Sequence, residues 1–141
     1  IPLSAYTKEN RFKLFMFDIG ILGAMSKLPA KTILDYSYGT YKGYFAENYA
    51  LQQLAVNYQH AIFNWQEDRS EIEFLLQAED NVIPIEIKSG NITRAKSMEK
   101  YREKYHPQKS FIISANNLKR NHSSNVIHLP LYLIEYLERF I

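Results

Sequence analysis

The sequence predicts a domain of the mixed α/β (α+β) class, with helices on the flanks of a central mixed sheet. Three observations support this class. A helical pattern at residues 41–58 precedes three strand-like segments, a charged helix-like segment follows at residues 93–105, and two short strands and an apolar helix come last. The expected order of elements is therefore α-β-β-β-α-β-β-α, which is typical of a sheet covered by helices.

The first elements are expected at residues 11–28. The run "RFKLFMF" is rich in apolar and aromatic residues, which favours a short strand. Asp18 then stands at the N-cap position of a helix in "IGILGAMSKL", and Pro29 follows the end of that helix. The segment "KTILDYSYGTYKG" is rich in turn residues, and we expect it to be a connection.

The helix at residues 41–58 carries an acid on its apolar side. Leu51, Leu54 and Tyr58 recur at steps of three and four, which places them on one helical face. Glu47 precedes Leu51 by four residues and therefore lies on the same face. A carboxylate on the core-facing side of a helix indicates either a partner or a function.

Three strands are expected next, in "AIFNW", "EIEFLLQ" and "VIPIEIK", with the turn "AEDN" between the second and the third. Side chains alternate between the two faces of a strand. In the third strand the isoleucines at positions 83, 85 and 87 therefore share one face, while Glu86 and Lys88 share the other.

The rest of the chain completes the sheet and its cover. The helix at residues 93–105 ends before Pro107, because the residue before a proline disfavours the helical conformation. "SFIIS" and "NVIHL" predict two short strands, and "LPLYLIEYLERFI" predicts a closing apolar helix. We interpret residues 1–141 as one domain with a core from about residue 39, and as a fragment of a longer protein because the chain does not begin with Met.

Composition limits the classes of function. The chain has 46% apolar residues, no cysteine, a formal net charge of +2 and no apolar run long enough to span a membrane. These features predict a cytoplasmic domain with a packed core and without disulfides or thiolate metal sites. The phosphate-binding pattern G-x-x-x-x-G-K-[ST] does not occur, so we expect no ATP site of that type in this chain.

Four polar residues fit poorly with a purely structural role: Glu47, Glu73, Glu86 and Lys88. Glu73 and Glu86 lie on strands joined by a tight turn, and Glu47 can approach them from the helix. Converging carboxylates repel one another unless a cation lies between them, and oxygen ligands suit Mg²⁺ or Mn²⁺. Such an ion could activate water and Lys88 could stabilise charge on a phosphate, so the set predicts phosphodiester hydrolysis.

Ordinary explanations exist for the same residues. Glu86 and Lys88 could form a solvated ion pair, and Glu47 could pair with a nearby Arg or Lys. Glu71, two positions before Glu73, is a competing choice for the strand acid.

The helix at residues 93–105 also allows two interpretations. Its cations include Arg94, Lys96 and Lys100, and its acids include Glu99. The first interpretation is a solvated face with pairs at i and i+4, and the second is a contact with a nucleic-acid backbone.

Several motifs resemble known families. Glu47 on a helix, Glu73 on a strand and Glu86-Ile87-Lys88 on the next strand resemble the signature of the PD-(D/E)XK nuclease superfamily, whose fold is the restriction-endonuclease-like fold. The segments "FDIGIL", "YKGYFAENYALQQL", "SEIEFLLQ" and "VIPIEIKSG" also resemble an uncharacterised domain that follows an AAA-type ATPase domain in many bacterial and archaeal proteins. This chain has Glu73 where the superfamily more often has Asp, and it lacks the Pro-Asp pair.

The resemblance implies two alternative functions. In the first, the domain is a nuclease or nuclease-like DNA-binding module, with Glu47, Glu73 and Glu86 as ligands of Mg²⁺ or Mn²⁺ and with these acids and Lys88 as catalytic residues. In the second, it is an inactive interaction module that couples the upstream ATPase domain to a partner or to further copies in an oligomer. The exposed surfaces for that role are expected in "FKLFMF" and the closing helix.

Overall fold

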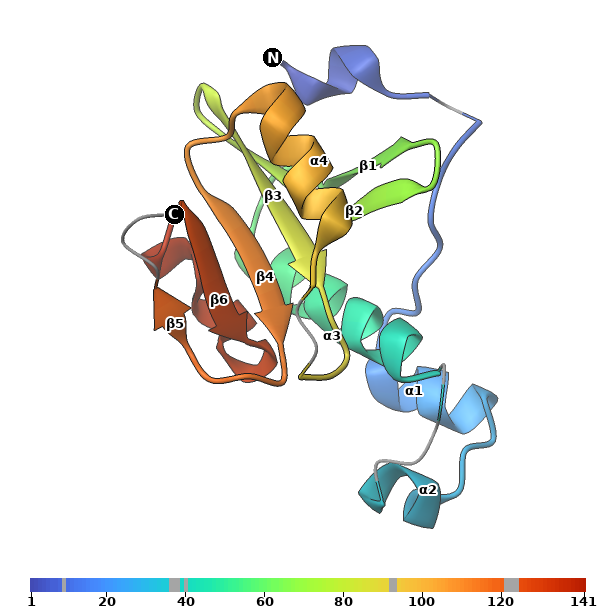
Figure 1. The fold of residues 1–141 in the computed structure, drawn as a ribbon. Helices are drawn as coiled ribbons and strands as arrows, with labels where there is room; N and C mark the ends of the chain where they lie inside the picture. The colour runs from blue at the N-terminus through green and yellow to red at the C-terminus, as the bar shows by residue number, and fades with distance from the viewer. Residues whose placement is uncertain (9, 36–38, 40, 92–93, 121–124) are drawn as a thin grey trace.

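The structure is a computed structural model, and it describes residues 1–8, 10–35, 39, 41–91, 94–120 and 125–141. In the described part, six strands form one mixed sheet in the order β1-β2-β3-β4-β6-β5, with helices on both faces (Figure 1). The predicted α/β class, with helices flanking a mixed sheet, is confirmed.

The elements follow one another largely as expected. The helices are η1 (Leu3–Tyr6), α1 (Ile19–Met25), α2 (Ala30–Leu34), α3 (Tyr41–Asn57), α4 (Lys96–Tyr105) and η2 (Leu131–Arg139). The strands are β1 (Phe63–Glu67), β2 (Ser70–Ala78), β3 (Asn81–Ile87), β4 (Ser110–Ser114), β5 (Lys119–Arg120) and β6 (Val126–Pro130). No helix in these ranges is long and apolar enough to cross a membrane.

The sheet combines antiparallel and parallel pairing. β1, β2 and β3 form an antiparallel meander, and β3, β4 and β6 run parallel. Helix α4 connects β3 to β4, because parallel neighbours need a crossover connection. The core therefore has two layers, one on each face of the sheet.

Alternation in β3 assigns its side chains to these layers. Ile83, Ile85 and Ile87 pack with helix α3 and η2 in one layer. Val82 packs with helix α4 in the other layer, together with Ile72 of β2. The predicted division of β3 into two faces is confirmed, and it places Glu86 on the side of α4.

The predicted strand at residues 11–17 is wrong, because this segment belongs to no sheet. Instead, the backbone groups of Met16 in this segment form hydrogen bonds with a side chain of α3. The buried Asn48 accepts a hydrogen bond from the Met16 N–H at 2.8 Å and donates one to the Met16 carbonyl at 3.1 Å. Gln52 accepts from the Ile19 N–H at 3.0 Å. An amide side chain thus takes the place of a neighbouring strand.

Other differences are local. Asp18 caps α1 as predicted, since its Oδ1 accepts from the Ile21 N–H at 3.0 Å. The expected connection at residues 31–43 contains the short helix α2, which begins after Pro29. The closing helix is of the 3-10 type and is kinked at Tyr136. Helix α4 ends before Pro107 as predicted, whereas its expected start at Thr93 lies outside the described residues.

Candidate acid–lysine site

Glu86 is the most buried acid of the predicted set. Only 1% of the residue is exposed, on the side of β3 that faces α4. Its Oε1 lies 2.5 Å from the Lys88 Nζ, and its Oε2 accepts a hydrogen bond from the Met98 N–H of α4 at 3.2 Å. Both carboxylate oxygens therefore have partners, and the predicted proximity of Glu86 and Lys88 is observed as a short ion pair.

Glu73 lies at an irregularity in β2. Phe63 and Trp65 of β1 pair with Leu75 and Ile72 of β2, so β2 contains one more residue than β1 over this stretch. This is the arrangement of a β-bulge, which redirects a side chain and loosens the pairing. The bulge falls on Glu73 and Phe74, next to the last register pair between β2 and β3, which joins Phe74 to Ile85.

Beyond the pair of Phe74 and Ile85, the side chain of Glu73 replaces a backbone hydrogen bond between β2 and β3. Its Oε2 accepts a hydrogen bond from the Ile87 N–H at 3.0 Å. A carboxylate oxygen of β2 thus satisfies a backbone donor of β3 where the two strands no longer pair directly. Among the described residues Glu73 makes no ion pair with a lysine, an arginine or a histidine.

The surroundings raise the pKa of Glu73 from 4.5 to about 7. Burial is the main cause, because it disfavours the charged carboxylate. The hydrogen bond from Ile87 opposes the shift, and the negative charges of Glu86 and Glu47 add to it. Glu73 therefore interacts electrostatically with both of the other predicted acids.

Glu47 lies on α3 and pairs with a lysine. Its Oε2 is 3.2 Å from the Nζ of Lys13, and the same ammonium lies 2.6 Å from Oε1 of Glu71. Burial lowers the pKa of Lys13, but the hydrogen bond to Glu71 and the charges of both acids outweigh this effect, so the net pKa is raised. The alternative interpretation of Glu47, pairing with a nearby cation, is confirmed.

Lys13 was not among the residues predicted for this site. It precedes Glu47 by 34 residues, so no short-range pattern connects the two. One signal was available. Lys13 interrupts a run of apolar residues, and the structure points Phe12 and Leu14 outwards while Lys13 faces the acids. A lysine that lies between two outward-facing apolar residues can thus indicate a cation that points inwards.

The predicted acids are brought near one another but do not form a single set of ligands. Glu86 lies on the α4 side of the sheet, Glu47 comes from α3 on the other side, and Glu73 lies between them at the edge of the β2–β3 pairing. Within the described ranges no three His, Cys, Asp or Glu side chains form a group that could hold a metal ion.

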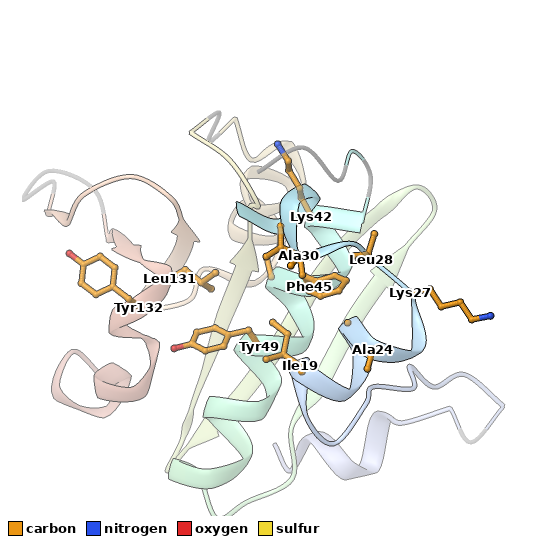
Figure 2. Close-up of a pocket in the computed structure, with 14 residues that line it drawn as sticks. Ile19, Ala24, Lys27, Leu28, Ala30, Lys42, Phe45, Tyr49, Leu131 and Tyr132 are labelled. Carbon is orange, nitrogen blue, oxygen red and sulfur yellow. The ribbon is translucent and has the colours of Figure 1, made fainter. Parts of the chain in front are cut away.

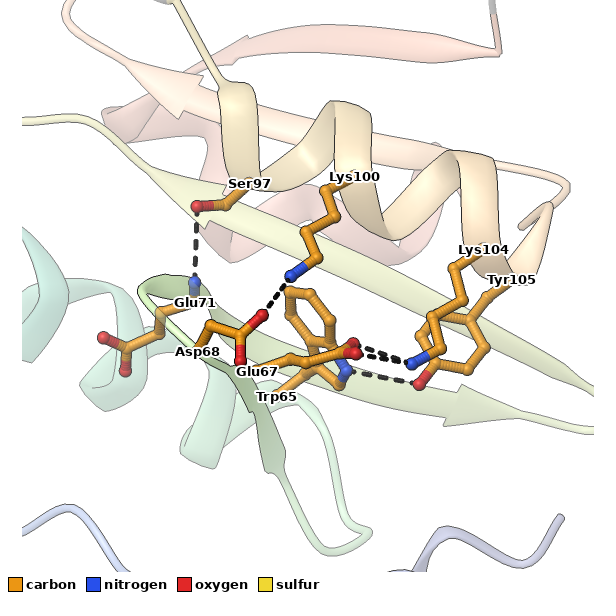
Figure 3. Close-up of polar contacts among 8 residues, drawn as sticks. All are labelled: Trp65, Glu67, Asp68, Glu71, Ser97, Lys100, Lys104 and Tyr105. Atoms are coloured by element: carbon orange, nitrogen blue, oxygen red, sulfur yellow. Dashed lines mark hydrogen bonds and ion pairs between the residues drawn. The ribbon is translucent and has the colours of Figure 1, made fainter.

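The cations of α4 differ in their surroundings (Figure 3). Lys100 lies 2.9 Å from Asp68, and Lys104 lies 2.7 Å from Glu67, both at the turn between β1 and β2. These pairs join α4 to the turn instead of linking positions i and i+4. Arg94 and Lys96 are exposed near the start of α4.

Two cavities flank the sheet on the side of α3. A cavity of about 440 Å³ lies between the N-terminal segment and β1, and Glu73 and Lys13 both contribute to its lining. A larger and mainly apolar cavity of about 750 Å³ lies among α1, α2, α3 and η2 (Figure 2). Phe45 and Tyr49 line it from α3, and the side chains of Lys27 and Lys42 extend away from it.

Comparison with known proteins identifies the family. Residues 42–132 match the model of the domain of unknown function DUF4143, which covers well over half of the chain, and the chain therefore belongs to this family. No curated protein and no solved structure matches the chain. The match includes Glu47, Glu73, Glu86 and Lys88 but not Lys13, so the lysine that pairs with Glu47 comes from outside the matched region.

Proposed function

We propose that this domain binds nucleic acid at Glu73, Glu86 and Lys88 and hydrolyses a phosphodiester bond there. The observation that carries the proposal is the state of Glu73. Its carboxyl has a pKa of about 7, has no cationic partner among the described residues, and lies where β2 separates from β3. Perturbed acids next to a charge pair are typical of functional sites, because a structural acid is more stable when fully paired.

The chain's own residues supply two of the required roles. A carboxylate with a pKa near neutral pH can accept a proton from an attacking water and later release it, so Glu73 is suited to be the general base. Lys88 is about 29% exposed and can stabilise negative charge on a bound phosphate, while Glu86 holds its ammonium in place at 2.5 Å. Arg94 and Lys96 are exposed and available to contact neighbouring phosphates.

The carboxylates of this site are ligands of the kind that divalent ions prefer. Mg²⁺ and Mn²⁺ prefer carboxylate oxygens. Burial is the main cause of the raised pKa of Glu73, and a cation would offset the smaller part that comes from the charges of Glu86 and Glu47. Because the described acids form no group of three that could hold a metal, Glu86 would be the direct ligand, Glu73 would act on a water of the ion, and water and phosphate oxygens would complete the coordination. When bound, the ion would acidify water and neutralise phosphate charge. In the present arrangement lysines pair with Glu47 and Glu86.

Cleavage assays on the whole chain test this proposal. Labelled single-stranded and duplex DNA and RNA are incubated with Mg²⁺, with Mn²⁺ or with EDTA. We expect metal-dependent cleavage that falls at least about 100-fold in Glu73→Gln and in Lys88→Met, since general acid–base catalysis and electrostatic stabilisation of the transition state each contribute a factor of about that order. Glu79→Gln, on the exposed turn of the same hairpin, is the matched control and should cleave normally.

Two results would contradict the proposal. One is the absence of cleavage of every form of nucleic acid together with the absence of Mg²⁺ or Mn²⁺ binding in calorimetry. The other is cleavage by Glu73→Gln at the rate of the unsubstituted chain.

A specific observation favours a second function, that of an interaction module. Apolar side chains of the first 34 residues are widely exposed, with Leu14 at 87%, Phe17 at 91% and Leu34 at 84%. The apolar cavity beside α1 and α2 adjoins this surface. Such a concentration of exposed apolar groups is typical of a surface that contacts another protein domain. In this alternative the occupant is an upstream AAA-type ATPase domain of the same polypeptide.

Charge-removing variants separate the two functions. If the domain is only an interaction module, Glu73→Gln and Lys88→Met keep cellular function, whereas Phe17→Asp abolishes binding of the separately produced ATPase domain. If Glu73→Gln abolishes function in a chain that still folds, the interaction module alone does not explain the domain.

A further inference from the structure

The outer face of β1 has an unusual cover. On one face of β1, Trp65 packs against Tyr101 of α4 with ring centroids 5.2 Å apart. At the outer edge of the sheet, β1 meets the N-terminal strap, which we define as residues 3–8 and 10–18 (Figure 1). Both segments line the cavity of about 440 Å³, and Leu3 of the strap also packs against the cluster on the α4 side. The strap and β1 therefore border a cavity that Asn64 and Gln66 line from the face of β1 opposite Trp65.

The strap is held at both ends. The Leu3 N–H donates to the Gln77 Oε1 of β2 at 2.9 Å. At the other end Met16 is held by Asn48, and Lys13 is held by Glu47 and Glu71. These contacts anchor described residues of the strap at both ends of the cavity. Its volume lies within the range of about 300–1,000 Å³ that is common for ligand pockets.

The cavity is lined by two kinds of side chain. The exposed aromatic rings of the lining are Tyr6 and Phe12 on the strap. Phe63 of β1 also borders the cavity and packs against the cluster on the α4 side. Tyr6 is 76% exposed and Phe12 is 73% exposed, so these two rings border the opening instead of filling the core. Large exposed rings beside a cavity offer flat surfaces for a planar ligand.

The polar side chains of the lining include both cations and amides. They are Lys8 and Arg11 on the strap and Asn64 and Gln66 on β1. Within the described ranges no hydrogen bond or ion pair engages any of these four side chains. By contrast, Lys100 and Lys104 on the α4 side of the same strand are both paired.

We propose that this cavity binds one unpaired nucleotide of a nucleic-acid strand. The base stacks on Phe12, Asn64 and Gln66 bind its edge, and Lys8 and Arg11 bind the adjoining phosphate. Stacking on aromatic side chains together with a basic track is how proteins bind single strands, and amide side chains suit the donors and acceptors of base edges. The cavity is too small for a segment of duplex.

The position of Glu73 connects this cavity with the acid–lysine site. Glu73 belongs to the lining and also interacts with Glu86 and Glu47. A nucleotide in the cavity therefore places its phosphate beside the proposed general base. In this respect the inference rests on the proposed function, and it narrows the substrate to a single strand or a frayed end.

Binding of defined oligonucleotides tests the proposal. Fluorescence anisotropy measures the affinity of the whole chain for a labelled 12-nucleotide dT strand and for a blunt duplex, with EDTA present so that no cleavage occurs. We expect the single strand to bind at least tenfold more tightly than the duplex. Phe12→Ala should weaken single-strand binding about tenfold, because stacking on one aromatic ring contributes about 5- to 100-fold.

Matched variants on the same segment serve as controls. Phe17→Ala removes a ring that is 91% exposed and outside the lining, and it should bind as the unsubstituted chain does. Arg11→Ala should weaken binding at low salt, whereas Lys31→Ala, an exposed cation on α2, should not. All four positions are exposed, so the fold tolerates these changes, and circular dichroism verifies this.

The outcomes distinguish this inference from the proposed function. Equal affinity of Phe12→Ala and the unsubstituted chain, or tighter binding of the blunt duplex, overturns the nucleotide cavity. If Glu73-dependent cleavage of duplex is found at the same time, the proposed function stands without the cavity. Tight single-strand binding without any cleavage supports the cavity and counts against the hydrolytic activity.

Discussion

The acids on the two sides of the β1–β2 hairpin differ in their ionic partners. On the side of α4, Asp68 pairs with Lys100 and Glu67 pairs with Lys104, at an exposed surface where ionic partners are easily exchanged for water. On the side of the strap, Glu73 is half-buried and has no cationic partner among the described residues, and its pKa is raised to about 7. The first side has paired charges where pairing contributes little. On the second side Lys13 pairs with Glu71 and Glu47, and Glu73 remains without a cation where one would contribute more.

This difference separates structural charges from functional ones. Exposed ion pairs contribute about 0–1 kcal/mol each, so the pairs of α4 mainly fix the orientation of a helix. A buried acid without a cation lowers the stability of the fold, and its persistence in a well-packed hairpin indicates another use. Three substitutions test this contrast, from the largest expected effect to the smallest.

The largest effect is expected for Glu86→Ala. The change leaves the Met98 N–H without its acceptor and Lys88 without its carboxylate, at a residue that is 1% exposed. Loss of partners for a buried hydrogen bond and an ion pair costs about 2–4 kcal/mol. Urea unfolding measures the loss. Asp68→Ala, which removes the exposed pair with Lys100, should cost less than about 1 kcal/mol, and equal losses in the two variants would contradict the contrast.

The next effect is a gain in stability for Glu73→Gln. The folded state binds the Glu73 proton with a pKa of about 7, whereas the unfolded value is near 4.5. Between these pH values the folded chain holds more protons than the unfolded chain, so the free energy of unfolding contributed by this group falls as pH rises and is lowest above pH 7. The shift corresponds to about 3 kcal/mol at most.

Thermal or urea unfolding at pH 5 and at pH 8 measures this gain. Glu73→Gln should be more stable than the unsubstituted chain at pH 8 by about 1–3 kcal/mol, and the difference should shrink towards pH 5. Glu79→Gln on the exposed turn should show no such dependence on pH. A loss of stability at pH 8 in Glu73→Gln would show that the carboxylate is well paired.

The smallest effect is expected for Lys13→Met. This variant keeps the length of the side chain but removes the ammonium that bridges Glu47 and Glu71, both of which are partly exposed. We expect a loss of about 1 kcal/mol that diminishes at high salt, because screening weakens the attraction. Lys31→Met on α2 is a suitable control. A loss of stability that does not change with salt would mean that Lys13 stabilises the strap by packing and not by its charge.

Sequence patterns predicted those parts of the fold that depend on neighbours along the chain. Alternation placed Ile85 and Glu86 on opposite faces of β3, and the N-cap preference identified Asp18. The bulge at Glu73 depends on the register of β1 against β2, and no local pattern records that register. The contacts of Lys13 with Glu47 and of Met16 with Asn48 join residues more than 30 positions apart, and they explain why residues 11–17 lie outside the sheet.

The ionisation of Glu73 is the most direct test of the account. A titration of its side-chain carboxyl by ¹³C NMR in the folded chain measures the pKa itself, with Glu73→Gln used to assign the signal. We expect a pKa of about 7, which falls when Mg²⁺ or Mn²⁺ is added. A pKa at or below 4.5 that does not respond to either ion would contradict the assignment of Glu73 as the centre of this site.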